Sequence, residues 1–239
     1  MTDSDLYTFD TNGYLVVEDA LNPTEISVIN EALDREWTER QDTFYTRSKN
    51  TWQSVRVMEM ETVFDDLVIH PPVFELLKGI MSDNIAFSEL SVILKAPGAD
   101  THARWHNDVG YQGAPMSQSL LLISCIYYLS DVMADSACFA VVPGSHRFDR
   151  PLPAVDHFYD MPAHIPLTGK AGTAILFHGN LWHAAYPSRS DQTRRTVHIY
   201  YCRPWMKPSG HTKIPPRLID SAETDFIKIF YHTNWGAVK

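Results

Sequence analysis

IAFSELSVILKAPG (residues 85–98) is the stretch that decides the fold class. Residues 85–95 are rich in side chains that favour strands, and Ala96-Pro97-Gly98 then ends the segment as a turn. Downstream the chain repeats this pattern four times, in SLLLISCIYYLSD (119–131), CFAVV (138–142), GTAILF (172–177) and TVHIYYCR (196–203). Because no helical segments alternate with these strands, the pattern predicts an antiparallel sandwich or barrel rather than a parallel sheet.

Helices are expected on both sides of the strand region. NPTEISVINEALDREW (22–37) has an N-cap residue in Asn22, a first-turn proline in Pro23 and the capping-box acid Glu25. A shorter helix should follow His70-Pro71-Pro72, and a last one should cover residues 221–232. These helices are interpreted as packing elements around an inner double sheet.

Composition excludes several classes of function. The net charge is −9 and the only adjacent basic pair is Arg194-Arg195, so a nucleic-acid or membrane surface is not expected. The longest apolar run (119–129) is too short to span a bilayer, and the acidic start MTDSDLYTFD is unlike a secretory signal. Three cysteines without a CxxC pair indicate reduced core thiols, so we expect a cytoplasmic protein.

RWHNDVGY (104–111) contains two candidate metal ligands, His106 and Asp108, separated by one residue. If this stretch is extended, both side chains project to the same face. His-x-Asp is common by chance, so a third ligand is needed. His183, in FHGNLWHAAYP (177–187), stands out because it follows a strand closely, at the start of a polar connection. Two imidazoles and one carboxylate are the facial triad of non-haem Fe(II) oxygenases.

Such an oxygenase would need one further residue. A 2-oxo acid chelating the iron would carry a second carboxylate into a largely desolvated barrel, where an arginine fork is its best partner. Near His183 the candidates are Arg189, Arg194 and Arg195. Strand alternation alone does not say whether Arg194 or Arg195 faces inward.

Several motifs occur in a fixed order along the chain. They are Lys95-x-Pro97-Gly98, Trp105-His106-x-Asp108-x-x-Tyr111, Pro143-Gly144-Ser145-His146, and Gly172 before the strand that leads to Trp182-His183 and an arginine. In this the chain resembles the phytanoyl-CoA dioxygenase family of Fe(II)/2-oxoglutarate-dependent oxygenases, from about residue 10 to 205. The resemblance implies a mainly β fold with flanking helices around a double-stranded β-helix, the cupin-like jelly roll. We expect one domain over 1–239, with a helical N-terminal region (about 1–84), a jelly-roll core (about 85–205) and a C-terminal extension (206–239).

The resemblance also implies residue roles. His106, Asp108 and His183 match the catalytic iron ligands, and Arg194, placed eleven positions after His183, matches the arginine that binds 2-oxoglutarate. The resemblance therefore favours Arg194 over Arg195 as the arginine that faces inward. Two positions depart from the family pattern: Ala185 replaces a small hydroxyl residue, and Ser136-Ala137 replaces Asn-Gly. Ser124 is the candidate for a replacement contact with the cosubstrate.

Four further residues are candidates for the substrate pocket. Trp105, Tyr111 and Gln112 flank the proposed ligand strand, although buried packing explains them equally well. His198 would line the pocket if Arg194 faces inward. Asn107 should point away from the metal.

The implied activity is oxidation of a C–H bond in a small, secondary-metabolite-type substrate, using Fe(II), 2-oxoglutarate and O2 and releasing succinate and CO2. Hydroxylation is the default outcome, with desaturation, cyclisation or epimerisation as the others. Two alternatives stay open: a cupin-like metal-dependent hydrolase or isomerase, which would not need Arg194, and a non-catalytic binding protein on the same fold. The sequence leaves monomer and homodimer undecided.

Overall fold

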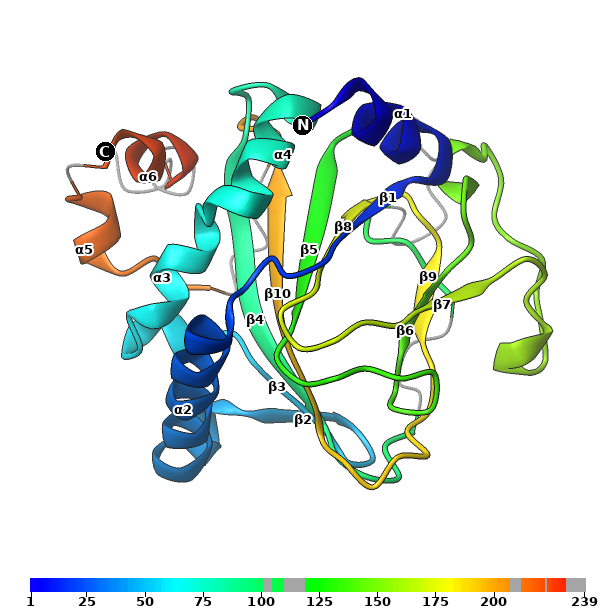
Figure 1. Cartoon of the computed structure of the whole chain (residues 1–239), viewed down its shortest axis with the longest axis horizontal. Helices are drawn as coiled ribbons and strands as arrows, with labels where there is room; N and C mark the ends of the chain where they lie inside the picture. The colour runs from blue at the N-terminus through cyan, green and yellow to red at the C-terminus, as the bar shows by residue number, and fades with distance from the viewer. Residues whose placement is uncertain (101–104, 110–118, 207–211, 222, 231–239) are drawn as a thin grey trace.

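The computed structural model of this chain describes residues 1–100, 105–109, 119–206, 212–221 and 223–230. Within these residues the strands form two antiparallel sheets (Figure 1). The large sheet has seven strands, in the order β1 (Tyr14–Val17), β8 (Ala174–His178), β5 (Leu122–Tyr128), β10 (Arg194–Cys202), β4 (Ala86–Lys95), β3 (Thr51–Ser54) and β2 (Tyr45–Ser48). The small sheet has three, in the order β7 (Ile165–Leu167), β6 (Phe139–Val141) and β9 (His183–Ala185).

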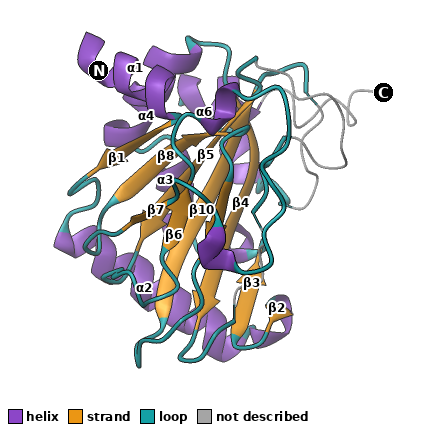
Figure 2. Cartoon of the chain, turned by 90° about the vertical axis from the view of Figure 1, so that its right-hand side faces the viewer, coloured by secondary structure: helices purple, strands orange, loops and turns teal. Residues whose placement is uncertain are grey.

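Helices cover the outer face of the large sheet. They are α1 (Asp3–Asn12), α2 (Pro23–Glu39), α3 (Val63–Val68), α4 (Pro71–Met81), α5 (Pro216–Ile219) and α6 (Thr224–Phe230). In Figure 1, α2, α3, α5 and α6 lie on one side of β4 and β10, and the small sheet lies on the other. Figure 2 shows β6 and β7 in front of the long strands from that other side. Single 3₁₀ turns occur at Gln41–Thr43, Val57–Glu59, Ser145–Arg147 and Phe158–Asp160.

The predicted jelly-roll architecture and the main expected elements are confirmed. The side chain of Asn22 accepts hydrogen bonds from the amides of Thr24 and Glu25 (2.9 and 3.0 Å), and the Glu25 carboxylate accepts one from the amide of Asn22 (2.7 Å). This capping box satisfies the first amides of α2, so the helix begins where the sequence predicts. All three cysteines are buried free thiols, as expected.

Two apolar cores lie on the two faces of the large sheet. One fills the space between the sheet and the helices, and includes Ile29, Leu33, Phe64, Leu77, Val197, Ile199 and Tyr201. The other lies between the sheets, and includes Ile126, Tyr128, Phe139, Ile175 and Phe177. Because successive strand residues point to opposite faces, β10 sends its apolar side chains to the first core and Arg194, Thr196 and His198 to the other face.

The region expected to be helical, residues 1–84, also contributes three strands to the large sheet. These are β1, which pairs with β8, and the hairpin of β2 and β3, which pairs with β4. Each has only four residues and little alternation of polar and apolar side chains, so it lacks the pattern by which a strand is recognised. The sheet therefore begins at Tyr14, well before residue 85.

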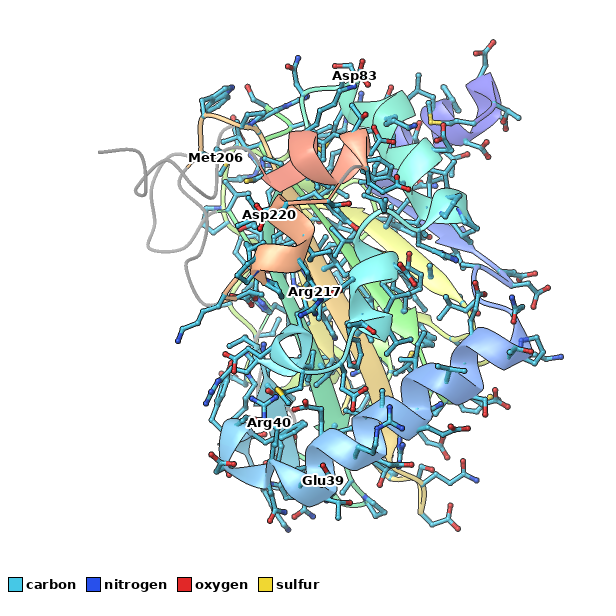
Figure 3. The ribbon with its side chains drawn as sticks, turned by 90° about the vertical axis from the view of Figure 1, so that its left-hand side faces the viewer. Glu39, Arg40, Asp83, Met206, Arg217 and Asp220 are labelled. Atoms are coloured by element: carbon cyan, nitrogen blue, oxygen red, sulfur yellow. The ribbon has the colours of Figure 1, made fainter. Side chains whose placement is uncertain are left out.

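The residues beyond 205 lie outside the resemblance to the family, yet α5 and α6 fold back onto the helical layer, and α6 falls within the helix expected over 221–232. Figure 3 labels Arg217 on α5, beside α3. Its guanidinium makes two hydrogen bonds to the Asp65 carboxylate (2.7 and 3.0 Å) and a third to the carbonyl of Met58 (2.6 Å). None of the described helices has the length and apolarity needed to cross a bilayer.

Gly172 fixes the connection that leads into β8. Its φ is +95°, its amide donates to the carbonyl of Tyr128 (2.7 Å), and its carbonyl accepts from the amide of Leu21 (3.0 Å). A Cβ at this position would lie 2.5 Å from the carbonyl oxygen of Leu21.

We therefore expect Gly172→Ala to lower the free energy of unfolding by about 2–4 kcal/mol, combining left-handed strain with a backbone clash. Gly98→Ala is the matched control, because φ is +69° there and the nearest atom to a Cβ is 3.7 Å away. It should lose only about 1–2 kcal/mol in urea unfolding, from the strain alone. Equal losses in both variants would contradict a contribution from the clash.

Candidate metal centre

His106, Asp108 and His183 meet between the two sheets. His106 and Asp108 come from the connection between β4 and β5, and His183 is the first residue of β9. One ligand atom from each side chain lies within 4.8 Å of the other two. His183 Nε2 is 3.6 Å from Asp108 Oδ1, and the two imidazole rings are 4.3 Å apart between centroids. Two imidazoles and one carboxylate at this spacing suit a divalent transition metal such as Fe(II).

The predicted strand through the first two ligands is absent from residues 105–109, where only an isolated bridge is formed. In that bridge, His106 and His183 each donate their amide to the other's carbonyl (3.1 and 2.8 Å). The amide of Asp108 donates to the carbonyl of Gly179 (2.8 Å). The two side chains thus converge because their backbone is tied to the segment that carries His183, and not because of strand alternation.

Hydrogen bonds orient the ligand atoms. His183 Nδ1 lies 2.8 Å from the carbonyl of Leu181, and since a carbonyl only accepts, the proton sits on Nδ1 and the Nε2 lone pair faces the triad. Burial, helped by the neighbouring imidazole of His106, lowers the pKa of His183 to about 4. The side chain is therefore neutral at pH 7, as a metal ligand must be.

Ser124 on β5 holds the carboxylate. Its hydroxyl donates to Asp108 Oδ2 (2.8 Å), which leaves Oδ1 facing His183. This differs from the cosubstrate contact expected for Ser124. The side chain is 1% exposed, its single hydroxyl proton is used by Asp108, and it is not among the described residues that line the cavity.

A cavity of about 380 Å³ adjoins the triad. It opens between the sheets, and both sheets supply its walls. The side chains that line it, besides the triad, include apolar residues around the ligands and polar ones from β2, β3, β4 and β10: Tyr45, Arg47, Thr51, Gln53, Ser88, Glu89, Ile93, Lys95, Leu122, Ile126, Phe139, Phe177, Ala184, Ala185, Arg194, His198 and Tyr200.

Arg194, and not Arg195, faces this cavity. Arg194 is 3% exposed, and its Nε and Nη2 atoms are buried without a hydrogen-bond partner in the described part of the chain. Arg195 points to the helical side, where its Nη1 lies 2.8 Å from Asp34 Oδ1. A buried guanidinium with two unused donors is costly without an anion, so this part of the cavity suits an anionic guest.

The other candidate residues lie in different places. His198 lines the cavity, with Nε2 3.0 Å from the Thr196 hydroxyl, and burial lowers its pKa well below the usual value. Trp105 stacks on Phe158 (5.1 Å between centroids) and donates to its carbonyl (3.1 Å), so it packs in the core between the sheets. Tyr111 and Gln112 lie outside the described residues.

Sequence reasoning missed the polar wall of the cavity. Arg47 and Gln53 lie on β2 and β3, which were not expected as strands, and Nη1 of Arg47 donates to Oε1 of Gln53 (2.7 Å). Lys95 and Glu89 lie on β4 and share its cavity face. The sequence analysis named Lys95 only as part of a motif. Lys95 and Glu89 are an even number of positions apart, so a strand over this segment places both side chains on the same face, and this spacing could have identified them.

Comparisons with known proteins agree with this geometry. The sequence model of the family described as phytanoyl-CoA dioxygenase (PhyH) matches residues 9–196. A dioxygenase of Aspergillus fumigatus named af480 is 24% identical over 241 residues, which covers 95% of this chain and 76% of that protein.

Solved structures share the fold. The epimerase SnoN, in complex with Fe3+, α-ketoglutarate and nogalamycin RO, superposes with a TM-score of 0.71 at 19% identity, over 93% of this chain and 90% of that one. HygX from Streptomyces hygroscopicus, with nickel, 2-oxoglutarate and hygromycin B bound, gives 0.70 at 17% identity over 90% of each chain. Since the family model spans most of the sequence, this chain belongs to the phytanoyl-CoA dioxygenase family and is an Fe(II)- and 2-oxoglutarate-dependent dioxygenase.

Proposed function

We propose that His106, Asp108 and His183 bind the Fe(II) of this dioxygenase, and that Arg194 binds the distal carboxylate of 2-oxoglutarate. The observation that carries the proposal is the buried guanidinium of Arg194, whose Nε and Nη2 lack a partner among the described residues and which lines the same cavity as the triad. A hydrolase or isomerase on this scaffold would have no use for that buried cation, so the alternative is disfavoured.

Bound Fe(II) and 2-oxoglutarate would supply the oxidising chemistry, in which 2-oxoglutarate and O2 yield succinate and CO2 while a substrate C–H bond is oxidised. The protein positions these groups and keeps water away from them. Leu181 and Ser124 orient His183 and Asp108, and Arg194 fixes the far end of the cosubstrate. The side chains of Ile126, Phe139 and Phe177 exclude water from the neighbourhood of the ligands.

The substrate is proposed to be a small molecule of the secondary-metabolite type. SnoN and HygX have nogalamycin RO and hygromycin B bound, which supports this class. Tyr45, Gln53, Glu89 and Tyr200 line the cavity and offer hydrogen-bonding groups. A substrate carrying hydroxyl or amino groups near the oxidised carbon fits this lining. The default outcome of the reaction is hydroxylation.

Removing one ligand should strongly weaken metal binding and abolish turnover without unfolding the protein. We expect Asp108→Ala to lower Fe(II) affinity by about a hundredfold or more, because two imidazoles remain of a three-ligand site. Anaerobic calorimetry measures the affinity, and succinate release measures turnover. His157→Ala is the control, since His157 is exposed and outside the triad. Unchanged Fe(II) affinity in Asp108→Ala would contradict the ligand assignment.

Arg194→Gln should weaken 2-oxoglutarate binding by about tenfold to a hundredfold, the range expected for losing hydrogen bonds between charged groups. Affinity for Fe(II) alone should not change. The readout is the visible band that 2-oxoglutarate produces on Fe(II) under anaerobic conditions. Arg195→Gln is a matched control, because Arg195 pairs with Asp34 on the opposite face. If Arg195→Gln has the larger effect, Arg194 is not the cosubstrate arginine.

Ser124→Ala tests the orientation of the carboxylate. Loss of the hydrogen bond to Asp108 Oδ2 should lower metal affinity by about 10–100-fold, the usual cost of removing such a supporting partner. Ser27→Ala, on the exposed face of α2, should leave it unchanged. If Ser124→Ala instead leaves metal affinity intact and weakens only 2-oxoglutarate, Ser124 acts on the cosubstrate as the sequence suggested.

A further inference from the structure

Basic and acidic side chains lie at opposite ends of the cavity wall formed by β4. Lys95 and Glu89 both line the cavity, and the extended chain between them spans about 20 Å. The basic end lies beside Arg194, because Lys95 and Arg194 are register partners. Among the described residues that line the cavity, Glu89 is the only acid besides Asp108 of the triad. The end that contains Glu89 therefore suits a group opposite in charge to the anion expected at Arg194.

A β-bulge in β4 enlarges the polar part of the wall at this end. Glu89 is the register partner of Tyr200 on β10, and Phe87 is that of Tyr201, so Ser88 is the extra residue. Ser88 and Glu89 both line the cavity, although consecutive residues of a regular strand point to opposite faces. Bulges are common beside functional sites, where they redirect a side chain. This bulge adds a hydroxyl beside the carboxylate.

The C-terminal extension holds this part of β4 from the other side. The Thr212 hydroxyl accepts a hydrogen bond from the amide of Leu90 (3.1 Å) and donates one to the carbonyl of the same residue (3.0 Å). Glu89 directly precedes Leu90, and it is only 9% exposed. The backbone position of the acid is therefore set before a guest binds, which limits the entropy lost on binding.

His198 supplies a second acceptor from the neighbouring strand. Its register partner is Ser91, so it lies diagonally across from Glu89, at about 7–8 Å. The Thr196 hydroxyl donates to the carbonyl of Ile93 (3.3 Å), so it accepts from Nε2–H of His198 (3.0 Å). Burial lowers the pKa of His198 well below its usual value, so the ring is neutral and Nδ1 keeps its lone pair. Because His198 lines the cavity, a guest meets an acceptor there.

The two acceptors suit the same kind of guest. 2-Oxoglutarate has only acceptor groups at neutral pH, so it satisfies neither the Glu89 carboxylate nor the His198 lone pair. A guest with donors satisfies both, and a positive charge on the donor beside Glu89 strengthens that hydrogen bond. A carboxylate has about four acceptor positions, so Glu89 can bind such a guest in addition to donors of the chain.

We propose that the substrate is an amino alcohol, with an ammonium group that binds Glu89 and a hydroxyl on the adjacent carbon that donates to Nδ1 of His198. The two acceptors reach toward each other across the diagonal between the strands, which suits donors on adjacent carbons. The inference rests on the proposed function, because it places the cosubstrate at the triad and Arg194. It narrows the substrate class to small cations.

The test uses a series of cyclic 1,2-amino alcohols of increasing ring size, each paired with the matching 1,2-diol. Calorimetry on the anaerobic protein with Fe(II) and 2-oxoglutarate measures their affinities. The best amino alcohol should bind about tenfold to a hundredfold more tightly than its diol, because its ammonium bonds to a charged partner. In Glu89→Gln this ratio should fall to about threefold or less, while Glu89→Asp should keep part of it. Glu39→Gln removes an exposed acid of α2 (Figure 3) and should change neither affinity.

The contribution of His198 is measured with the parent cyclic amine, which lacks the hydroxyl. In the wild type the amino alcohol should bind about twofold to tenfold more tightly than this amine, the range for one neutral hydrogen bond. His198→Phe should remove that difference and keep the preference for amino alcohol over diol. If His198→Phe retains the full contribution of the hydroxyl, the role given to His198 is wrong.

Cosubstrate binding is checked on the same samples through the visible band of 2-oxoglutarate on Fe(II), which the Glu89 variants should keep. The proposal is overturned if no amino alcohol binds the wild type more tightly than its diol, or if Glu89→Gln retains the preference. Loss of the band in Glu89→Gln would place Glu89 at the cosubstrate, and would overturn it as well. With the band present in the wild type, only this inference fails. If the wild type forms no band, the proposed function fails with it.

Discussion

The alternation of side chains along β10 is the constraint on which the site depends. Val197, Ile199 and Tyr201 pack against the helical layer, and burial of each large apolar side chain contributes about 1.5–3 kcal/mol. That packing fixes the register, since a slip of one residue would send these side chains into the cavity. Arg194 must then face inward, where its guanidinium is desolvated. The packing of the helices on the sheet thus decides which arginine faces the cavity.

The cavity carries a local charge opposite to that of the whole protein. The chain has a net charge of −9, yet Lys95, Arg47 and Arg194 all line one cavity. Lys95 and Arg194 repel each other, which disfavours the cavity without a bound anion. A ligand that binds only the folded state also stabilises that state.

The triad joins the two sheets and the connection between β4 and β5. His183 belongs to the small sheet, Asp108 is hydrogen-bonded to Ser124 on the large sheet, and His106 is bridged to His183 through the backbone. The side chains of His183 and Asp108 are each oriented by a partner outside the triad, Leu181 and Ser124, which is how metal sites fix the geometry of their ligands. The hydroxyl of Ser124, on β5, donates its one proton to Asp108.

The sequence by itself determined the antiparallel β class and the start of α2 at its capping box, and through the resemblance to a family it predicted the candidate metal ligands and the arginine that faces the cavity. These features depend on local patterns that a linear reading detects. The sequence did not reveal the strands β1, β2 and β3. They are too short to show alternation, and they form only because β8 and β4 offer edges to pair with. Nor did it place Lys95 beside Arg194. Cross-strand register depends on how two distant segments pack, and only the tertiary structure decides that.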